Sequence, residues 1–316
     1  MKKILVTGGA GNVGSALSKA LISTESYQVV IADNLITGDI RKLPQHASNF
    51  TFIKCDVNDY NEIAPIIFSN KFDYIFHYAA LVGVKRTLDN PIMVLDDIDG
   101  IKNILTLSKN TGVKRVFFSS SSEVYGEPVE FPQNEHTTPL NSKLPYAIVK
   151  NVGEAFFQSY YKEFGLEYTI FRFFNTYGPG QSDDFVVPRF INMALKNEDI
   201  TIYGDGSQTR TFCYIDDNIE ATKRIFEDSL HINDIVNIGS GIELSVLDLA
   251  RKVVSITGSS SKIIHLPALE EGDMTRRLPD NSKMLNVVGR PLMPVEDGIK
   301  ILSGLFKQRT LHTTKI

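Results

Sequence analysis

The chain has 316 residues, 42% of them hydrophobic, and a formal net charge of −4. The small negative charge provides no general attraction to nucleic acid or to a membrane surface, so neither partner is expected. No apolar run reaches the about eighteen residues that a transmembrane helix needs, and two lysines lead straight into the first predicted strand, so no signal peptide is expected either. The two cysteines, Cys55 and Cys213, match no metal-binding spacing. We therefore expect no metal site and a reducing, cytoplasmic setting.

A glycine-rich turn near the N-terminus is the strongest local signal. It lies between the apolar run 4–6, which predicts a buried strand, and a segment with helical periodicity that begins at Val13. Because glycine has no Cβ, such a turn lets a pyrophosphate approach the backbone N–H groups at the helix N-terminus. The turn predicts dinucleotide contacts from Gly8, Gly11, Asn12, Val13 and Gly14.

A second apolar run, 29–32, ends in Asp33, about twenty residues after Gly14, where dinucleotide-binding folds place the acid that binds the adenosine ribose. A carboxylate at this position would repel a 2′-phosphate, so the sequence predicts NAD rather than NADP. The segment 35–48 has no clear periodicity and is expected to form a loop over the adenosine. Asn34 and Gly38 are the further cofactor contacts expected from this region.

The predicted elements then alternate between strands and helices. Strands are expected at 50–54, 74–77, 116–118 and 168–173, and helices at 58–69, 91–110 and 146–164. This order predicts an α/β fold, a Rossmann-type doubly wound parallel sheet, with its ligand at the carboxyl ends of the strands. From Asn175 onward the pattern loosens into shorter elements. We expect an NAD-binding domain over 1–174 with a sheet strand returning near 233–239, a smaller C-terminal substrate-binding lobe over 175–307, and a polar tail over 308–316.

Tyr146 is followed four residues later by Lys150, which places both side chains on one helix face. A phenol is a poor base at neutral pH, but a nearby ammonium and a positively charged nicotinamide both favour the phenolate. Tyr146 could then remove a hydroxyl proton while hydride leaves the same carbon for the cofactor. Ser121, in the serine cluster after the fifth strand, could hold that hydroxyl in place.

Motifs along nearly the whole chain, to about Lys307, resemble those of the extended short-chain dehydrogenase/reductases. The resemblance rests on the glycine turn 7–14, the segment 77–80, the serine cluster with 124–126, and Tyr146-x-x-x-Lys150. The later segments 172–179 and 203–212 are similar to the branch of nucleotide-sugar epimerases, dehydratases and decarboxylases. The resemblance implies a nucleotide-diphosphate sugar as substrate and tightly bound NAD as cofactor, and products that feed surface polysaccharides or glycoconjugates.

The resemblance also assigns roles to individual residues. It implies that Ser121, Tyr146 and Lys150 are catalytic. Further cofactor contacts are implied for Asp56, Val57, Ala79, Ala80, Leu81 and Phe173. Substrate contacts are implied for Ser121, Ser122, Asn175, Arg189, Tyr203, Arg210 and Arg276 or Arg277. Many relatives are homodimers, and apolar residues beyond one core stripe on two helices predict a dimer here, namely Ile101, Ile104, Leu105, Leu107, Phe156, Phe157, Tyr160 and Tyr161.

The net reaction is less constrained, because every member of the branch first oxidises a sugar carbon, usually C4. A nucleotide-sugar 4-epimerase ranks first, a 4-dehydrogenase that releases the 4-keto sugar second, and a UDP-glucuronate decarboxylase or 4,6-dehydratase that uses Glu123 third. Glu123 and the segment Arg277-x-Pro279-Asp280 resemble the decarboxylases, but the segment 146–150 differs from theirs. The dTDP-glucose dehydratases carry an aspartate where Ser122 stands. A non-catalytic NAD-binding regulator is the alternative from a different class, and the intact catalytic trio argues against it.

One further departure from the family pattern is Asp97, where many relatives have asparagine. An ionised carboxylate near the cofactor would stabilise the positively charged NAD relative to NADH.

Overall fold

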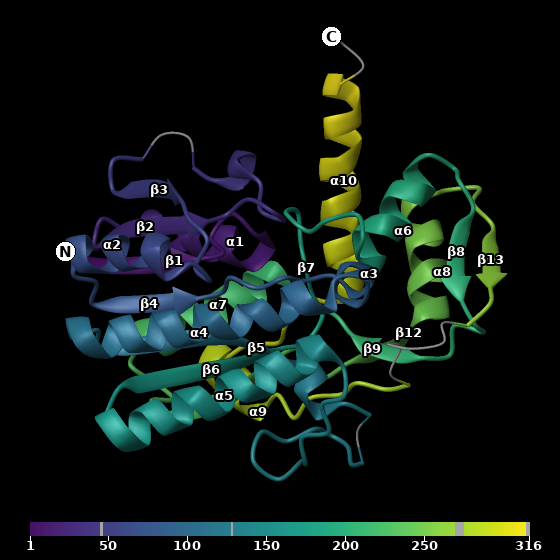
Figure 1. Ribbon diagram of the computed structural model, residues 1–316. Coiled ribbons are helices and arrows are strands. Elements are labelled where there is room, and N and C mark those ends of the chain that lie inside the picture. Colours follow the sequence, from purple (N-terminus) through teal and green to yellow (C-terminus); the bar gives the residue numbers. More distant parts are fainter. Residues whose placement is uncertain (45–46, 128, 269–274, 314–316) are drawn as a thin grey trace.

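The computed structural model describes residues 1–44, 47–127, 129–268 and 275–313 (Figure 1). Within these ranges the predicted doubly wound fold is confirmed: seven parallel strands form one sheet in the order β11-β6-β5-β4-β1-β2-β3. The strand β11 returns from the later part of the chain to pair with β6. The strands of this sheet are β1 (Lys2–Thr7), β2 (Tyr27–Asp33), β3 (Phe50–Lys54), β4 (Tyr74–His77), β5 (Arg115–Ser121), β6 (Glu167–Phe173) and β11 (Asp234–Ile238).

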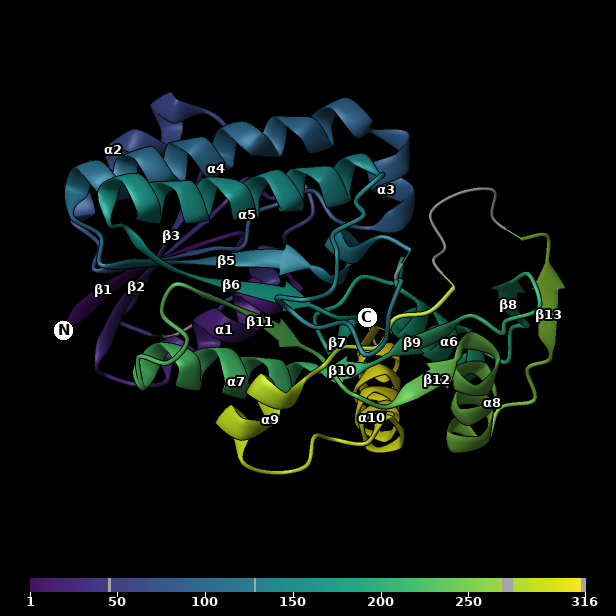
Figure 2. The same ribbon diagram turned by 90° about the horizontal axis from the view of Figure 1, so that it is seen from below.

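Helices cover both faces of the sheet. Figure 2 shows α2, α4 and α5 on one side and α1, α7 and α9 on the other. Side chains alternate across β1: Ile4 and Val6 pack in one core cluster and Leu5 in the other, as the two-residue period of a strand requires. The helices are α1 (Asn12–Ile22), α2 (Tyr60–Asn70), α3 (Val84–Asp89), α4 (Pro91–Thr111), α5 (Pro145–Phe164), α6 (Val186–Leu195), α7 (Ile215–Glu227), α8 (Val246–Thr257), α9 (Ser282–Val288) and α10 (Val295–Thr313), with short 3₁₀ helices η1 (Ile40–Lys42) and η2 (Ser122–Tyr125).

The two long helices that border the site have well-defined ends. Each begins with a proline in its first turn, Pro91 in α4 and Pro145 in α5, where the missing N–H has no helical partner to lose. Each ends at a glycine in the left-handed region, Gly112 with φ of 76° and Gly165 with φ of 71°. These signals fix where α5 starts and therefore where Tyr146 lies.

Beyond the sheet, three short strand pairs and the helices α6, α8 and α10 form the other side of the molecule (Figure 1). The pairs are β7 (Thr176–Tyr177) with β10 (Cys213–Tyr214), β9 (Thr209–Thr211) with β12 (Glu243–Ser245), and β8 (Ile200–Tyr203) with β13 (Ile263–Leu266).

Three expectations need correction. The fifth strand is longer than predicted, because Ser119, Ser120 and Ser121 continue its pairing with β6 and are buried despite being polar. The expected polar tail 308–316 is helical as far as Thr313, and 314–316 lie outside the described residues. The α4 side chains expected at a dimer surface are buried in the subunit's own core, at 0–2% exposure: Ile101, Ile104, Leu105 and Leu107.

None of the helices in the described ranges is both long enough and apolar enough to cross a membrane.

Candidate active site

A cavity of about 1530 Å³ opens at the carboxyl ends of the parallel strands, between the sheet and the short strand pairs. This is the position that the strand order predicts for a ligand. The cavity brings together almost all residues expected from the sequence. They are Gly8, Gly11, Asn12, Val13, Gly14, Asp33, Asn34, Asp56, Val57, Ala79, Ala80, Leu81, Ser121, Ser122, Glu123, Tyr146, Lys150, Phe173, Asn175, Arg189, Tyr203, Arg210 and Arg277. Gly38 and Arg276 do not line it.

The glycine turn at one end of the cavity is packed too tightly for side chains. Gly8 has φ of +66°, and a Cβ there would lie 2.6 Å from the backbone nitrogen of Ala79. A Cβ on Gly14 would collide with the carbonyl oxygen of Gly8. The bare backbone therefore faces the cavity at the start of α1, which fits a dinucleotide pyrophosphate.

Replacing Gly14 with alanine is expected to destabilise the fold by about 1–3 kcal/mol, because the new methyl group meets backbone rather than a flexible side chain. We expect NAD affinity to fall by about tenfold or more, since the turn must open to make room. Chemical denaturation and NAD titration measure the two effects. Gly304→Ala is the matched control, because a Cβ at Gly304 has no heavy atom within 4 Å. Equal stability and affinity in the Gly14 and Gly304 variants would contradict the tight packing.

Asp33 is held rigidly beside this turn. Its Oδ2 accepts a hydrogen bond from the Ala10 N–H at 2.9 Å and its Oδ1 accepts one from the Leu35 N–H at 2.8 Å. Gly38 lies against the same carboxylate, and a Cβ there would collide with it. Gly38 is not among the residues that line the cavity, so its contact with the cofactor stays a prediction, and its missing Cβ leaves room for the Asp33 carboxylate. The fixed carboxylate fits the ribose hydroxyls of NAD.

Ser121, Tyr146 and Lys150 converge on the cavity from two elements. Ser121 ends β5, and its hydroxyl lines the cavity with the Tyr146 phenol from the first turn of α5, where it acts on the pKa of Tyr146. The Nζ of Lys150, one turn further along α5, lies 5.7 Å from the centroid of the Tyr146 ring and 4.9 Å from that of Phe118. Lys150 is only 3% exposed. The arrangement can hold a sugar hydroxyl between a hydrogen-bonding serine and a phenol.

The electrostatics of this trio depend on burial. Burial raises the pKa of the Tyr146 phenol, the charge of Glu123 raises it further, and the hydrogen bond with Ser121 lowers it. Burial lowers the pKa of the Lys150 ammonium to about 8, against the opposing charges of Asp97 and Glu154. The protein alone therefore keeps Tyr146 protonated. A phenolate requires more positive charge in the cavity, which a bound oxidised nicotinamide would provide.

Arg277 places a positive charge beside Glu123. Its Nη2 lies 3.6 Å from Glu123 Oε1, and its Nη1 donates to the Ser122 hydroxyl at 3.4 Å. The Arg277 side chain is 8% exposed, and its Nε is buried without a hydrogen-bond partner within the described ranges. Because Arg277 lines the cavity, its positive charge suits an anionic group of a ligand.

Arg276 points elsewhere. Its guanidinium makes two hydrogen bonds to Glu243, at 2.7 and 2.6 Å, and stacks 4.1 Å from the centroid of the Phe131 ring. Of the two arginines that the sequence left open for the substrate, Arg277 is the one that reaches the cavity.

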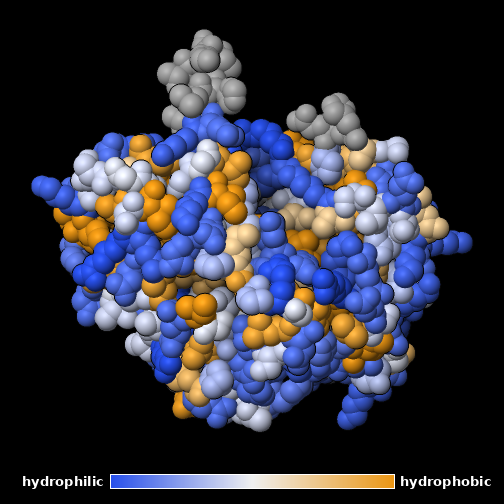
Figure 3. Space-filling view, turned by 180° about the vertical axis from the view of Figure 1, so that it is seen from behind, coloured by the Kyte–Doolittle hydropathy of each residue, from blue (hydrophilic) through white to orange (hydrophobic). Residues whose placement is uncertain are grey.

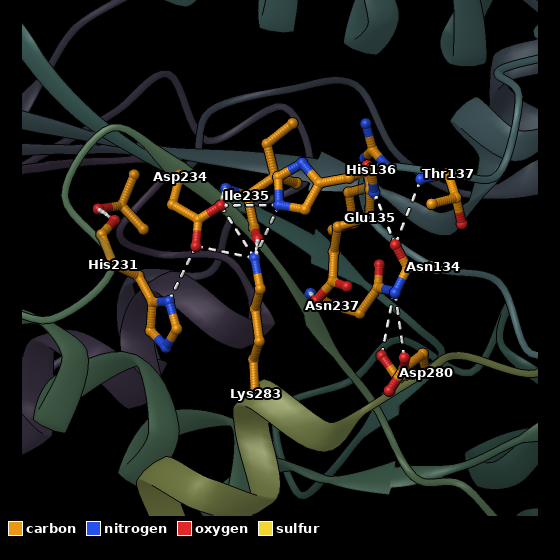
Figure 4. Close-up of polar contacts among 12 residues, drawn as sticks. Asn134, Glu135, His136, Thr137, His231, Asp234, Ile235, Asn237, Asp280 and Lys283 are labelled. Carbon is orange, nitrogen blue, oxygen red and sulfur yellow. Dashed lines mark hydrogen bonds and ion pairs between the residues drawn. The ribbon is translucent and has the colours of Figure 1, made fainter.

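The segment that carries Arg277 is fixed by buried polar contacts. Gln133 donates its N–H to the Leu278 carbonyl at 2.7 Å, and its own carbonyl accepts from the Asp280 N–H at 2.8 Å. Asn237 of β11 donates to the same Gln133 carbonyl at 2.8 Å. Figure 4 shows the neighbouring contacts, in which Asn134 meets Asp280 and the Lys283 ammonium meets Asp234. The main sheet and the start of α9 thus hold the ends of the extended segment that presents Arg277.

Among the lining residues that were not predicted are Asn58, Thr176 and Gln208. Asn58 follows the assigned Asp56 and Val57 beyond the end of β3, Thr176 follows the assigned Asn175, and Gln208 lies just before Arg210. The rule that ligands lie beyond strand ends could have extended the predicted set to these neighbours.

Comparisons with known proteins agree with this geometry. The model of the NAD dependent epimerase/dehydratase family matches residues 4–239. A UDP-N-acetyl-alpha-D-glucosaminuronate decarboxylase of Bacillus cytotoxicus is 36% identical, over 95% of this chain and 96% of its own length. The UDP-glucuronic acid decarboxylase 1 of Danio rerio is 35% identical, over 98% of this chain and 74% of its own length. A UDP-glucose 4-epimerase of Thermotoga maritima, solved with UDP-glucose, matches with a TM-score of 0.91 and 31% identity, over 98% of this chain and 99% of that one.

The expected resemblance to the extended short-chain dehydrogenase/reductases is therefore confirmed. Because the family model spans most of the chain and these relatives span nearly all of it, the chain belongs to the NAD-dependent epimerase/dehydratase family and is an NAD-dependent enzyme that modifies nucleotide sugars.

Proposed function

We propose that the enzyme decarboxylates a UDP-linked uronic acid after oxidising it at C4. The observation that carries this proposal is the pair of Arg277 and Glu123 in the cavity, next to Ser122 and within electrostatic reach of Tyr146. Neither epimerisation nor simple oxidation at C4 requires a guanidinium to bind a carboxylate that leaves the sugar. Arg277 lines the cavity, where its guanidinium can pair with a carboxylate on C5.

The proposed chemistry assigns a role to each side chain. Bound NAD supplies the acceptor for the C4 hydride and later returns that hydride. Tyr146 takes the proton from the C4 hydroxyl, Ser121 holds the oxygen, and Lys150 stabilises the phenolate. The carboxylate of the resulting β-keto acid is held by Arg277 and leaves as CO₂, and the electrons of the broken C5–C6 bond form an enolate. Glu123, or a water that it holds, protonates C5, and Tyr146 then returns its proton to the C4 oxygen.

The relatives support this order of preference. The Bacillus cytotoxicus and Danio rerio proteins are decarboxylases of UDP-linked uronic acids. Epimerisation at C4, which ranked first from the sequence, remains the second candidate because the Thermotoga maritima epimerase shares the fold over 98% of this chain. The two candidates share every step up to the ketone, so the product distinguishes them.

The test is incubation of the purified enzyme with UDP-glucuronate, UDP-N-acetylglucosaminuronate, UDP-glucose and UDP-N-acetylglucosamine, followed by mass spectrometry and NMR. Loss of CO₂ from a uronic acid with no lasting NADH absorbance supports the proposal. An unchanged mass with a new C4 stereoisomer would assign the enzyme as an epimerase instead. A product two hydrogens lighter with accumulated NADH would assign it as a 4-dehydrogenase, and no product would favour a regulator.

We also propose that the enzyme is a homodimer through α4 and α5. With Ile101 and its neighbours buried in the subunit core, the support comes from exposed apolar side chains on these helices, Leu95, Ile148, Tyr161 and Phe164, at 38–45% exposure. On the opposite face, drawn in Figure 3, hydrophobic residues lie scattered among hydrophilic ones. Light scattering at micromolar concentration is expected to give twice the chain mass, and a monomeric mass would contradict the proposal.

A reducing cytoplasmic location is proposed as well, and the two buried, unpaired cysteines support it.

A further inference from the structure

Asp97 projects from α4 into the cavity wall and is fixed there by two segments that end at the site. Its Oδ2 accepts a hydrogen bond from the Leu81 N–H at 2.8 Å, just beyond β4. Its Oδ1 accepts one from the Asn58 side chain at 3.4 Å, just beyond β3. An asparagine at this position would keep one oxygen acceptor, enough for the Leu81 N–H, and would lose the negative charge.

That charge acts on the catalytic face of α5. Asp97 raises the pKa of Lys150 against the effect of burial, and it also raises the pKa of Tyr146. Burial raises the pKa of Asp97 itself, and the charge of Lys150 opposes this.

The other charged and titratable groups around this face come from several elements. The charge of Asp56, beyond β3, raises the pKa of Asp97. The charge of Glu154 raises the pKa of Lys150, and the charge of Lys150 lowers the pKa of His77. Glu123 and Arg277 act on Tyr146, and Lys150 is the cation whose charge acts on Asp97.

We propose that Asp97 is a charge-balancing residue: its carboxylate, fixed in the cavity wall, stabilises the positively charged oxidised nicotinamide over the neutral reduced form. This rests on the family's use of NAD and not on which net reaction follows. Stabilising the oxidised cofactor makes the first hydride transfer harder and the return of hydride easier. Asp97 thereby favours a closed cycle in which the sugar leaves reduced at C4 and the cofactor ends oxidised.

The test is Asp97→Asn, which removes the charge and keeps one oxygen to accept from the Leu81 N–H. Its amide nitrogen takes the place of the oxygen in the longer contact with Asn58. Redox titration of the holoenzyme, followed by NADH absorbance, measures the balance of the two cofactor forms without any sugar. We expect the preference for the oxidised form to fall about tenfold, a rise of about 30 mV in the midpoint potential for this two-electron couple. Because the charge of Asp97 raises the pKa of both Lys150 and Tyr146, its removal should also move both limbs of the pH profile for hydride transfer to lower pH.

The matched control is Asp297→Asn on α10, outside the cavity, whose carboxylate pairs with Lys300 at 3.0 Å and is 53% exposed. An equal change of potential in both variants would show a general charge effect and overturn the proposal. An unchanged potential and pH profile in Asp97→Asn would also overturn it.

Asp97→Ala removes the hydrogen-bond acceptors as well as the charge, so a comparison with Asp97→Asn distinguishes an effect of the charge from an effect of the hydrogen bonds. It also provides a second measurement if the Asn variant folds poorly. Similar potentials in the Asn and Ala variants support the proposal, whereas a change confined to Ala shows a structural role and rejects it. The proposed decarboxylation is tested by the products of the UDP-sugars, whereas this proposal is tested by a redox potential measured without sugar. Failure of one can therefore be distinguished from failure of the other.

Discussion

Tyr146→Phe is expected to lower turnover by about 10²- to 10⁴-fold while leaving the fold and NAD binding nearly unchanged. The change removes one hydroxyl, which lies in the cavity with Ser121, and keeps the ring beside Lys150. Without the phenolic oxygen, no group in the trio can take the C4 hydroxyl proton as hydride leaves. Single-turnover NADH formation with a UDP-sugar measures the loss directly, before any later step can limit the rate.

Tyr161→Phe is the matched control for this experiment. It makes the same chemical change on the same helix, at a side chain that is 43% exposed and lies outside the cavity. Its turnover should equal that of the parent. If Tyr146→Phe reduced NAD as fast as Tyr161→Phe, the assignment of Tyr146 as the base would be wrong.

The parts of the site that could be predicted from sequence are those set by short-range geometry. The glycine turn needs its glycines within one strand-to-helix connection, and Tyr146 and Lys150 share a face because a helix repeats every 3.6 residues. The role of Asp33 could be predicted because this residue ends β2. The alternation of strands and helices along the chain places β2 beside β1 in a parallel sheet. In these cases the residues that must meet are close in the chain or lie at equivalent ends of adjacent strands.

The parts that could not be predicted depend on pairing between distant segments. Arg276 and Arg277 are chemically identical neighbours, and Arg276 is drawn away because Glu243, on β12, lies beside it. The residues next to 276–277 in the sequence give no information about the position of β12 in the fold. The same reason applies to Asp97, whose partners Leu81 and Asn58 come from other loops.

Helix periodicity had a similar limit on α4. It identifies apolar residues such as Ile101 and Leu105 but not whether the sheet, a neighbouring helix or a second subunit buries them. In the structure α4 packs against both α2 and α5, so more than one stripe is covered within the subunit.

Arg277→Met is expected to lower kcat/KM for the UDP-linked uronic acid by about 10²- to 10³-fold, because truncating one member of a buried charged pair costs about 3–4 kcal/mol. The loss should be confined to substrates with a C5 carboxylate, if that carboxylate is what the Arg277 guanidinium binds. NAD reduction by UDP-glucose in a single turnover should then change little.

Arg276→Met is the control for the Arg277 variant, since it removes the adjacent guanidinium, which pairs with Glu243 instead of reaching the cavity. Steady-state kinetics with UDP-glucuronate and single-turnover NAD reduction with UDP-glucose separate the possible roles. Equal losses with both sugars would mean that Arg277 binds the diphosphate, which all these substrates share. Decarboxylation would then have to rely on the instability of the β-keto acid alone, and the argument from Arg277 to a uronic acid would fail.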